Sequence, residues 1–310
     1  MKAIVLLSSF RSRDFIREQL ESIVGQDEVE VRLIVRDDGS DDDTMSMLQE
    51  LAATDSRIML IRGKNLGVVG SVFELLKAEQ TAEAPFIAFA DHDDIWPRGR
   101  LARQLTALSA LPADQPALCF GAFLRVNARG APIDGDPVLP PLPDKGALLS
   151  ENQVPGCTMV MNQAAHKLVA SNLPPADRIF MHDWWVEQVI AFTGTIIRVE
   201  DVVLHYRQHG ANMIGAPSDF RIWRDRLARI RRLRGQHPLL SQVRELHRRY
   251  GERMSVADRA RIERFIRAAD GSLAERLASV SAAGFRRARR SDDLFLRLLL
   301  LIGYFRSQVQ

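Results

Sequence analysis

The sequence contains little cysteine and no long apolar run. Its only two cysteines, Cys119 and Cys157, lie far apart in apolar or near-apolar surroundings. They therefore predict reduced core residues rather than a disulfide framework. No segment approaches the roughly 20 apolar residues that span a bilayer. Residues 2–7 pass directly into polar sequence, without the small-residue cleavage site of a secretory signal. We therefore expect a cytoplasmic protein.

The glycine patterns of two large nucleotide-binding classes are also missing. Gly67 and Gly70 do not form the G-x-G-x-x-G pattern, and no G-x-x-x-x-G-K-[ST] loop is present. These absences argue against nicotinamide cofactors and P-loop ATPases. The acidic residues around Gly39 lack the alternating ligands and late glutamate of an EF-hand.

Acidic residues are scarce in the last third of the chain. Residues 220–310 hold 22 arginines, no lysine and 9 acidic residues, a formal charge of +13, whereas residues 1–219 carry −10. Such asymmetry suggests two roles, and a basic region can meet nucleic acid or an anionic membrane. A solvated helical face explains the same charge. No recognised nucleic-acid motif is present and interleaved aromatics are sparse, so we expect no nucleic acid partner.

The order of apolar patterns predicts an α/β fold. Alternation of short apolar runs with helical periodicity is typical of βαβ units and a parallel sheet. A loop is expected over 127–147, and an Arg-rich, all-helical region from about 220 to the C-terminus. We expect two parts, residues 1–219 and residues 220–310. The predicted strands are 2–8, 30–36, 57–61, 85–90, 117–126 and 158–161, with paired strands at 195–199 and 202–206. The predicted helices are 13–24, 42–53, 69–80, 97–110, 163–171 and 183–193.

The most informative segment is ADHDDIWPRGRL, residues 90–101, which follows a predicted buried strand. Pro97 suits the first position of a helix. Asp91, Asp93 and Asp94 repel one another, and a divalent cation between them relieves that repulsion. Carboxylates without a nearby cysteine suit Mg²⁺ or Mn²⁺, and ligands of open α/β sheets bind beyond the carboxyl ends of strands. The segment predicts a metal site facing a diphosphate, although loop solvation and helix capping would also explain it.

Polar residues follow two other predicted strands. Asp37 and Asp38 end the second strand, where a carboxylate can accept hydrogen bonds from a base or a ribose, or can cap the next helix. Asn65 and Gly67 follow the third strand and suit a tight turn beside a ligand.

Two further clusters occur later in the chain. Asp183 lies in MHDWW, where it is either a helix cap or a general base beside an aromatic platform for a sugar. Arg207 and His209 lie in YRQHGAN, which gathers the groups that close over a diphosphate or complete a metal shell. A polar loop explains this second cluster equally well.

Taken in order, these pieces resemble a family-two inverting glycosyltransferase with the GT-A fold, and most of all the rhamnosyltransferase-like members of bacterial polysaccharide pathways. The resemblance runs from residue 1 to about 215. The motifs that carry it are RDDGSDDDT, NLGVVGSVFELL, FADHDDIW, GCTMVMN, MHDWW and YRQHGANMIG. It implies a GT-A Rossmann-like mixed sheet flanked by helices, with the all-α C-terminal extension outside the resemblance.

The resemblance also implies roles for particular residues. Ser9 and Asp38 match positions that contact the base and ribose of the donor. Asp91 and Asp93 match the D-x-D motif, which binds the ribose and the metal that bridges the diphosphate. Asp183 matches the catalytic base. The family often has Thr-Tyr-Asn where this chain has Ser9-Phe10-Arg11, so base selectivity stays open there.

The remaining expectations concern the ligands. We expect Arg11, Asp37, Asn65, Gly67 and Arg207 to contribute to the donor site, and His209 to the metal site. The cofactor is Mn²⁺ or Mg²⁺, the donor a dTDP- or UDP-sugar, with dTDP-rhamnose as one candidate, and the acceptor a glycan or lipid-linked glycan of a surface polysaccharide such as O-antigen. A glycoside hydrolase also needs two carboxylates around a sugar, but it would not explain the D-x-D motif.

The sequence allows two interpretations of the C-terminal helices, membrane binding or packing against protein. The run LFLRLLLLI, residues 294–302, is too short to cross a bilayer. It can lie in the interface of an anionic membrane, at the inner face of the plasma membrane, or it can pack on the catalytic part or form a homodimer.

Overall fold

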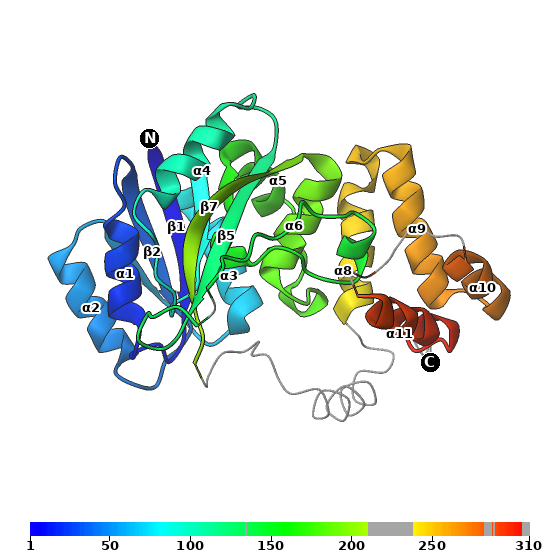
Figure 1. Cartoon of the computed structure of the whole chain (residues 1–310), viewed down its shortest axis with the longest axis horizontal. Helices are drawn as coiled ribbons and strands as arrows, with labels where there is room; N and C mark the ends of the chain where they lie inside the picture. Colours follow the sequence, from blue (N-terminus) through cyan, green and yellow to red (C-terminus); the bar gives the residue numbers. More distant parts are fainter. Residues whose placement is uncertain (134, 210–237, 282–286, 288, 306–310) are drawn as a thin grey trace.

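The computed structural model describes residues 1–133, 135–209, 238–281, 287 and 289–305. There the chain forms a seven-stranded sheet with helices on both faces and further helices at one end (Figure 1). The strands are β1 (Lys2–Ser9), β2 (Glu30–Asp37), β3 (Ile58–Arg62), β4 (Phe86–Ala90), β5 (Ala117–Val126), β6 (Val160–Asn162) and β7 (Thr195–Arg207). The helices are α1 (Ile16–Val24), α2 (Thr44–Thr54), α3 (Gly67–Lys77), α4 (Arg100–Ser109), α5 (Gln163–Ala170), α6 (His182–Thr193), α8 (Pro238–Tyr250), α9 (Val256–Asp270), α10 (Leu273–Ser281) and α11 (Arg290–Leu301).

The sheet is mixed, and its strand order is β3-β2-β1-β4-β6-β5-β7. Strand β1 pairs in parallel with β2 and β4, whereas β6 runs antiparallel between β4 and β5. The α/β fold with a mixed sheet is therefore confirmed. After β3 the chain returns to the other side of β1, so the strand order reverses between β1 and β4. Such a reversal leaves a crevice at the carboxyl ends of the strands, where ligands of open α/β sheets bind.

Each face of the sheet carries its own hydrophobic core, because successive side chains of a strand point to opposite faces. On β1, Leu6 packs in the core that contains residues of α3, α5 and α6, whereas Val5 and Leu7 pack in the core that contains residues of α1, α2 and α4. Burial on both faces explains why β1 is almost continuously apolar.

The C-terminal helices extend the first of these cores. Tyr250 of α8 lies 6.0 Å from Trp185 of α6, ring centre to ring centre, and Gln242 donates a hydrogen bond to Gln188 at 2.9 Å. Leu296 and Leu300 of α11 belong to the same hydrophobic cluster. Figure 1 shows α8 beside α6, with α9, α10 and α11 farther from the sheet. The expected boundary between residues 219 and 220 lies outside the described residues.

A search of the described helices for one long and apolar enough to cross a membrane finds none.

Two differences between the predicted and the observed elements have a clear structural cause. The helix expected from Pro97 begins at Arg100, because Gly99 takes a left-handed conformation (φ +71°) that ends a separate turn. The paired strands expected at 195–199 and 202–206 are one strand, β7, parallel to β5. No glycine or proline separates the two runs, and a register shift opposite Gly121 absorbs the extra residues. A Cβ atom at Gly121 would lie 2.6 Å from Val203 Cγ1, so the close approach of β7 requires glycine there.

Candidate active site

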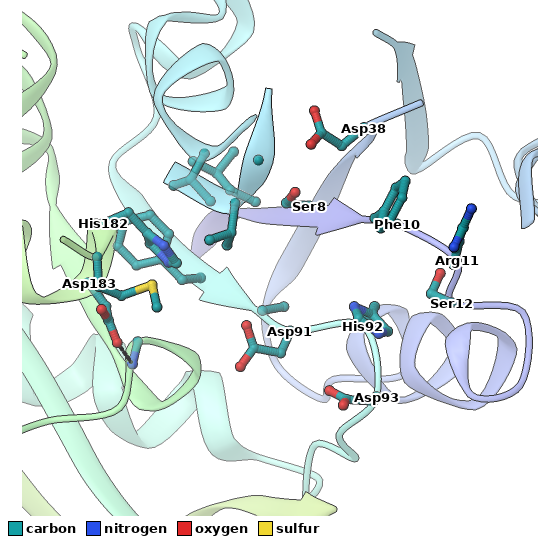
Figure 2. A pocket seen from close by; sticks show the side chains of 18 of the residues that line it. Ser8, Phe10, Arg11, Ser12, Asp38, Asp91, His92, Asp93, His182 and Asp183 are labelled. Carbon is teal, nitrogen blue, oxygen red and sulfur yellow. Dashed lines mark hydrogen bonds between the residues drawn. The ribbon is translucent and has the colours of Figure 1, made fainter. Parts of the chain in front are cut away.

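A cavity of about 640 Å³ opens at the carboxyl ends of β1 and β4, where the strand order reverses. It is lined by residues from the end of β1 and the segment after it, the segments after β2, β3 and β4, the segment before β6, the end of β7 and the start of α6. Figure 2 shows Asp91 and Asp93 on the segment after β4, Asp38 on the far side of β1, and Asp183 across the cavity from them. Of the eleven residues that the sequence predicts for a donor, metal or catalytic site, Ser9, Asp37 and Arg207 do not line this cavity. The other eight do: Arg11, Asp38, Asn65, Gly67, Asp91, Asp93, Asp183 and His209.

The acidic segment after β4 divides between the cavity and the protein interior. Asp91 and Asp93 line the cavity, whereas Asp94 is fully buried and accepts a hydrogen bond from the Arg207 backbone N–H at 3.0 Å. Desolvation, together with the charges of Asp93 and Asp183, raises the pKa of Asp91 to about 7. Burial also raises the pKa of Asp94 well above its ordinary value. The segment therefore concentrates negative charge that water does not fully solvate.

The geometry fits a divalent cation. His209 Nε2 lies 2.8 Å from Asp93 Oδ2, so two of the three expected metal ligands already touch. The other oxygen of Asp94, Oδ2, is buried and has no hydrogen-bond partner among the described residues. Asp91, Asp94 and Cys157 also offer ligand atoms that lie within 4.8 Å of one another. Hard carboxylate oxygens suit Mg²⁺ or Mn²⁺, and a cation would relieve the repulsion that raises the pKa of Asp91.

Sequence reasoning missed part of this grouping. It placed Cys157 in the core and Asp94 among the loop acids, and both cysteines are indeed free and buried. Cys157 approaches Asp91 because the segment after the 127–147 loop enters β6 beside β4. No spacing in the sequence announces that approach.

Asp38 is held rigidly on the other side of β1. Its Oδ1 forms a buried ion pair with Arg36 and accepts a hydrogen bond from the Leu66 N–H at 2.9 Å. Asn65 and Gly67 follow directly in the same turn, where Asn65 Oδ1 accepts from the Gly67 N–H at 3.2 Å. This turn therefore offers a fixed carboxylate and an amide side by side at the cavity wall.

Arg11 lies at the mouth of the cavity and is exposed. Its guanidinium donates two hydrogen bonds to Asp41, at 2.6 and 2.5 Å, which raises the pKa of Arg11 and lowers that of Asp41. Such an exposed pair contributes little stability, so Arg11 is free to exchange this partner for an anionic ligand.

Three of the predicted donor-site residues do not line the cavity but form hydrogen bonds behind its lining: Ser9, Asp37 and Arg207. Ser9 is buried and shares a hydrogen bond with Ser12 at 2.7 Å, and Asp37 accepts two from Ser40. The Arg207 guanidinium is buried, and it donates to the Asp93 and Ala128 carbonyls at 2.7 and 2.6 Å and to Glu18 at 2.5 Å. The polar side-chain atoms that we expected to bind the donor therefore already form hydrogen bonds within the protein.

Asp183 is held at the start of α6. Its Oδ2 accepts hydrogen bonds from Asn152 Nδ2 at 2.9 Å and the Gly156 N–H at 3.1 Å, while Oδ1 accepts from the Trp184 N–H at 2.7 Å. The expected aromatic platform is wrong, because Trp184 and Trp185 are buried in the core. Both indoles pack in the hydrophobic core, and neither lines the cavity.

Several cavity residues were not singled out from the sequence. Ser8, Phe10 and Ser12 line the cavity at the end of β1, and His182 and Asn152 line it beside Asp183. Alternation along β1 would have found Ser8, which lies on the same face as Leu6. Asn152 lies in an irregular segment far from Asp183 in sequence, and no local pattern indicates it.

The remaining residues of the last motif, from residue 210 onward, lie outside the described residues. Only Tyr206 and His209 of that motif are seen to line the cavity.

Comparison with known proteins agrees with this geometry. The family model described as glycosyl transferase family 2 matches residues 4–161. The dTDP-rhamnosyl transferase RfbG of Shigella flexneri is 24% identical over 241 residues, covering 73% of this chain and 79% of that protein. An Escherichia coli relative, the UDP-Glc:alpha-D-GlcNAc-diphosphoundecaprenol beta-1,3-glucosyltransferase WfaP, is 30% identical over 101 residues, covering 33% of this chain and 39% of that protein.

A solved structure shares the fold. The mannosyltransferase PcManGT from Pyrobaculum calidifontis, in complex with GDP-Man and Mn²⁺, superposes with a TM-score of 0.52 at 18% sequence identity. The superposition covers 97% of this chain and 80% of that one.

Proposed function

The chain belongs to glycosyl transferase family 2, and from this premise we propose that it is an inverting, metal-dependent enzyme of bacterial surface polysaccharide synthesis. It transfers a sugar from a nucleoside diphosphate donor to a hydroxyl group of a glycan or lipid-linked glycan. The observation that carries the proposal is the placement of Asp183 across one cavity from Asp91 and Asp93. Neither a glycoside hydrolase nor a nucleic-acid binder gains support from this cavity or from the relatives.

The nucleoside part of the donor lies beside β1 and the turn after β3. Asp38 accepts hydrogen bonds from the base or ribose, with Asn65 and Gly67 beside it. Arg11 exchanges Asp41 for an anionic group of the donor, since its present ion pair is exposed. The similarity to RfbG makes dTDP-rhamnose the first donor to test, and a UDP-sugar the second.

Asp91, Asp93 and His209 would hold Mn²⁺ or Mg²⁺ at the diphosphate. When bound, the cation supplies positive charge that stabilises the negative charge developing on the departing nucleoside diphosphate. The solved neighbour that contains GDP-Man and Mn²⁺ is consistent with such a cofactor. Arg207 acts behind these residues, because its guanidinium fixes the Asp93 carbonyl.

Asp183 is the general base. It removes the proton from the acceptor hydroxyl as the hydroxyl oxygen bonds to the anomeric carbon and the bond from that carbon to the diphosphate breaks. Asp183 lies across the cavity from Asp91 and Asp93 (Figure 2), and this placement supports an acceptor and a leaving group on opposite sides of the sugar. Attack from that side inverts the anomeric configuration, so a β-linked nucleotide rhamnose yields an α-rhamnoside.

The acceptor end of the molecule lies at an anionic membrane surface. Leu294, Leu298 and Ile302 of α11 and its C-terminal end are 71%, 52% and 62% exposed, and they recur at a helical spacing of four residues. Leu273 and Leu277 of α10 are also exposed. An apolar stripe in a region of formal charge +13 suits insertion among anionic head groups. This would bring the cavity to a lipid-linked acceptor at the inner leaflet.

A transfer assay tests the proposal. The purified chain is incubated with dTDP-rhamnose, UDP-glucose, UDP-N-acetylglucosamine or GDP-mannose, with Mn²⁺, Mg²⁺ or EDTA, and nucleotide release is measured. One donor should be consumed, and only with the metal. Asp183→Asn should keep donor affinity and lower kcat roughly 10²-fold to 10⁴-fold. Full transfer by Asp183→Asn, or consumption of no donor under any condition, would contradict the proposal.

A further inference from the structure

We infer that Asn152 is a positioning residue that fixes the carboxylate of Asp183 in the orientation needed for proton removal. The inference rests on the proposed function, in which Asp183 is the base. Asn152 Nδ2 donates to Asp183 Oδ2 at 2.9 Å, and both residues line the cavity. Asn152 is not itself a base, since an amide nitrogen donates and does not take up a proton at neutral pH.

The carboxylate of Asp183 is confined from several sides. The Gly156 N–H donates to the same oxygen as Asn152, and the Trp184 N–H donates to the other oxygen. A Cβ atom at Gly156 would lie 2.7 Å from Asp183 Cβ. The backbone therefore packs directly against the aspartate, and Asn152 is the only side chain among its three recorded hydrogen-bond donors in the described part of the chain.

The segment that carries Asn152 is anchored on both sides. Glu151 forms an ion pair with Arg287 at 3.2 Å, before α11. The Gln153 N–H donates to Glu187 Oε2 at 3.2 Å, one helical turn beyond Asp183 on α6. The Gln153 side chain forms two hydrogen bonds with the backbone of Asp144. Asn152 thus lies between two fixed neighbours, and its amide presents a donor at a defined place.

The same contacts allow a merely structural explanation, in which Asn152 ties an irregular segment to α6. The two explanations predict different effects of changing Asn152 when the Asp183 carboxylate is absent. A structural tie changes stability and donor binding whether or not the base is present. A positioning residue changes kcat, and only while the carboxylate is there to be positioned.

Two variants remove the donor of Asn152. Asn152→Ala deletes the amide, and Asn152→Asp keeps the shape and volume but replaces the donor with an acceptor. We expect either change to lower kcat about 10-fold to 100-fold, the equivalent of one lost hydrogen bond to a charged group. The donor KM should stay within about twofold, because Asn152 lies on the Asp183 side of the cavity. Gln153→Ala, which breaks ties of the same segment without touching Asp183, should keep kcat.

A double-mutant cycle with Asp183→Asn decides between the explanations. In the Asp183→Asn background, Asn152→Ala should cause no further loss of kcat. An additional loss equal to that in the wild type, or a rise in donor KM with unchanged kcat, would overturn the inference. Unchanged kcat in both Asn152→Ala and Asn152→Asp would also overturn the inference. If Asp183→Asn itself keeps full activity, the proposed base is wrong, and that failure is visible separately from any effect of Asn152.

Discussion

Replacement of Asp91 by asparagine should stabilise the metal-free protein at alkaline pH while removing metal binding. The pKa of Asp91 is raised from 3.8 to about 7 by burial and by the charges of Asp93 and Asp183. Between these two values the folded state binds a proton that the unfolded state has released. Stability therefore falls as pH rises from about 4 to about 7, and it stays low above pH 7.

The magnitude follows from the size of this pKa change. One pKa unit corresponds to about 1.4 kcal/mol, so a change from 3.8 to about 7 corresponds to about 4 kcal/mol in full. Asp91 faces the cavity, where solvent screens its charge. We therefore expect about half of this amount, roughly 2 kcal/mol, as the gain of Asp91→Asn at pH 8, and little gain at pH 4.

Urea unfolding followed by tryptophan fluorescence, in EDTA at several pH values, measures this gain. Asp114→Asn, in the exposed loop before β5, is the matched control and should change nothing. Excess Mn²⁺ should stabilise the wild type at pH 8 and leave Asp91→Asn unaffected. An Asp91→Asn variant that is less stable than the wild type at pH 8, or that keeps the wild-type pH dependence, would refute this reasoning.

Two further predictions concern the supporting wall and the C-terminal helices. Arg207→Lys should lower the free energy of unfolding by about 3 kcal/mol, because lysine cannot reach all three acceptors of the buried guanidinium; unchanged stability with weaker donor binding would instead indicate direct contact with the diphosphate. Leu294→Glu combined with Leu298→Glu should abolish co-sedimentation with anionic vesicles, whereas Val256→Glu on α9 should not. Wild-type protein that ignores vesicles and forms a dimer disrupted by the leucine changes would favour the dimer.

The sheet could be predicted because its signals are local. The first five strands read from the sequence agree with the structure to within one residue, since buried strands of a mixed sheet are near-continuous apolar runs. The start of α4 and the continuity of β7 could not be predicted this way. They depend on the left-handed conformation of Gly99 and on the room that Gly121 leaves for β7, and both are properties of the assembled structure.

Some cavity residues could likewise be predicted from the sequence, whereas others could not. Asp91 and Asp93 could be placed at the cavity because they follow a strand end, where the crevice of an open α/β sheet lies. The hydrogen bond from Asn152 to Asp183 joins residues 31 positions apart through an irregular segment. Such a contact is fixed by how that segment packs on α6, so a single sequence carries no periodic signal of it.

Ser8 and Ser9 are neighbours at the end of β1, but their side chains lie on opposite faces of the sheet. The resemblance favoured Ser9, yet Ser8 lines the cavity and donates to Ser71 of α3 at 2.6 Å. Side chains alternate along β1, so Ser8 shares the face of Leu6 and Ser9 that of Leu7. The cavity opens on the Leu6 face, next to α3. A motif aligned by sequence alone can therefore identify the strand end and still select a serine that does not line the cavity.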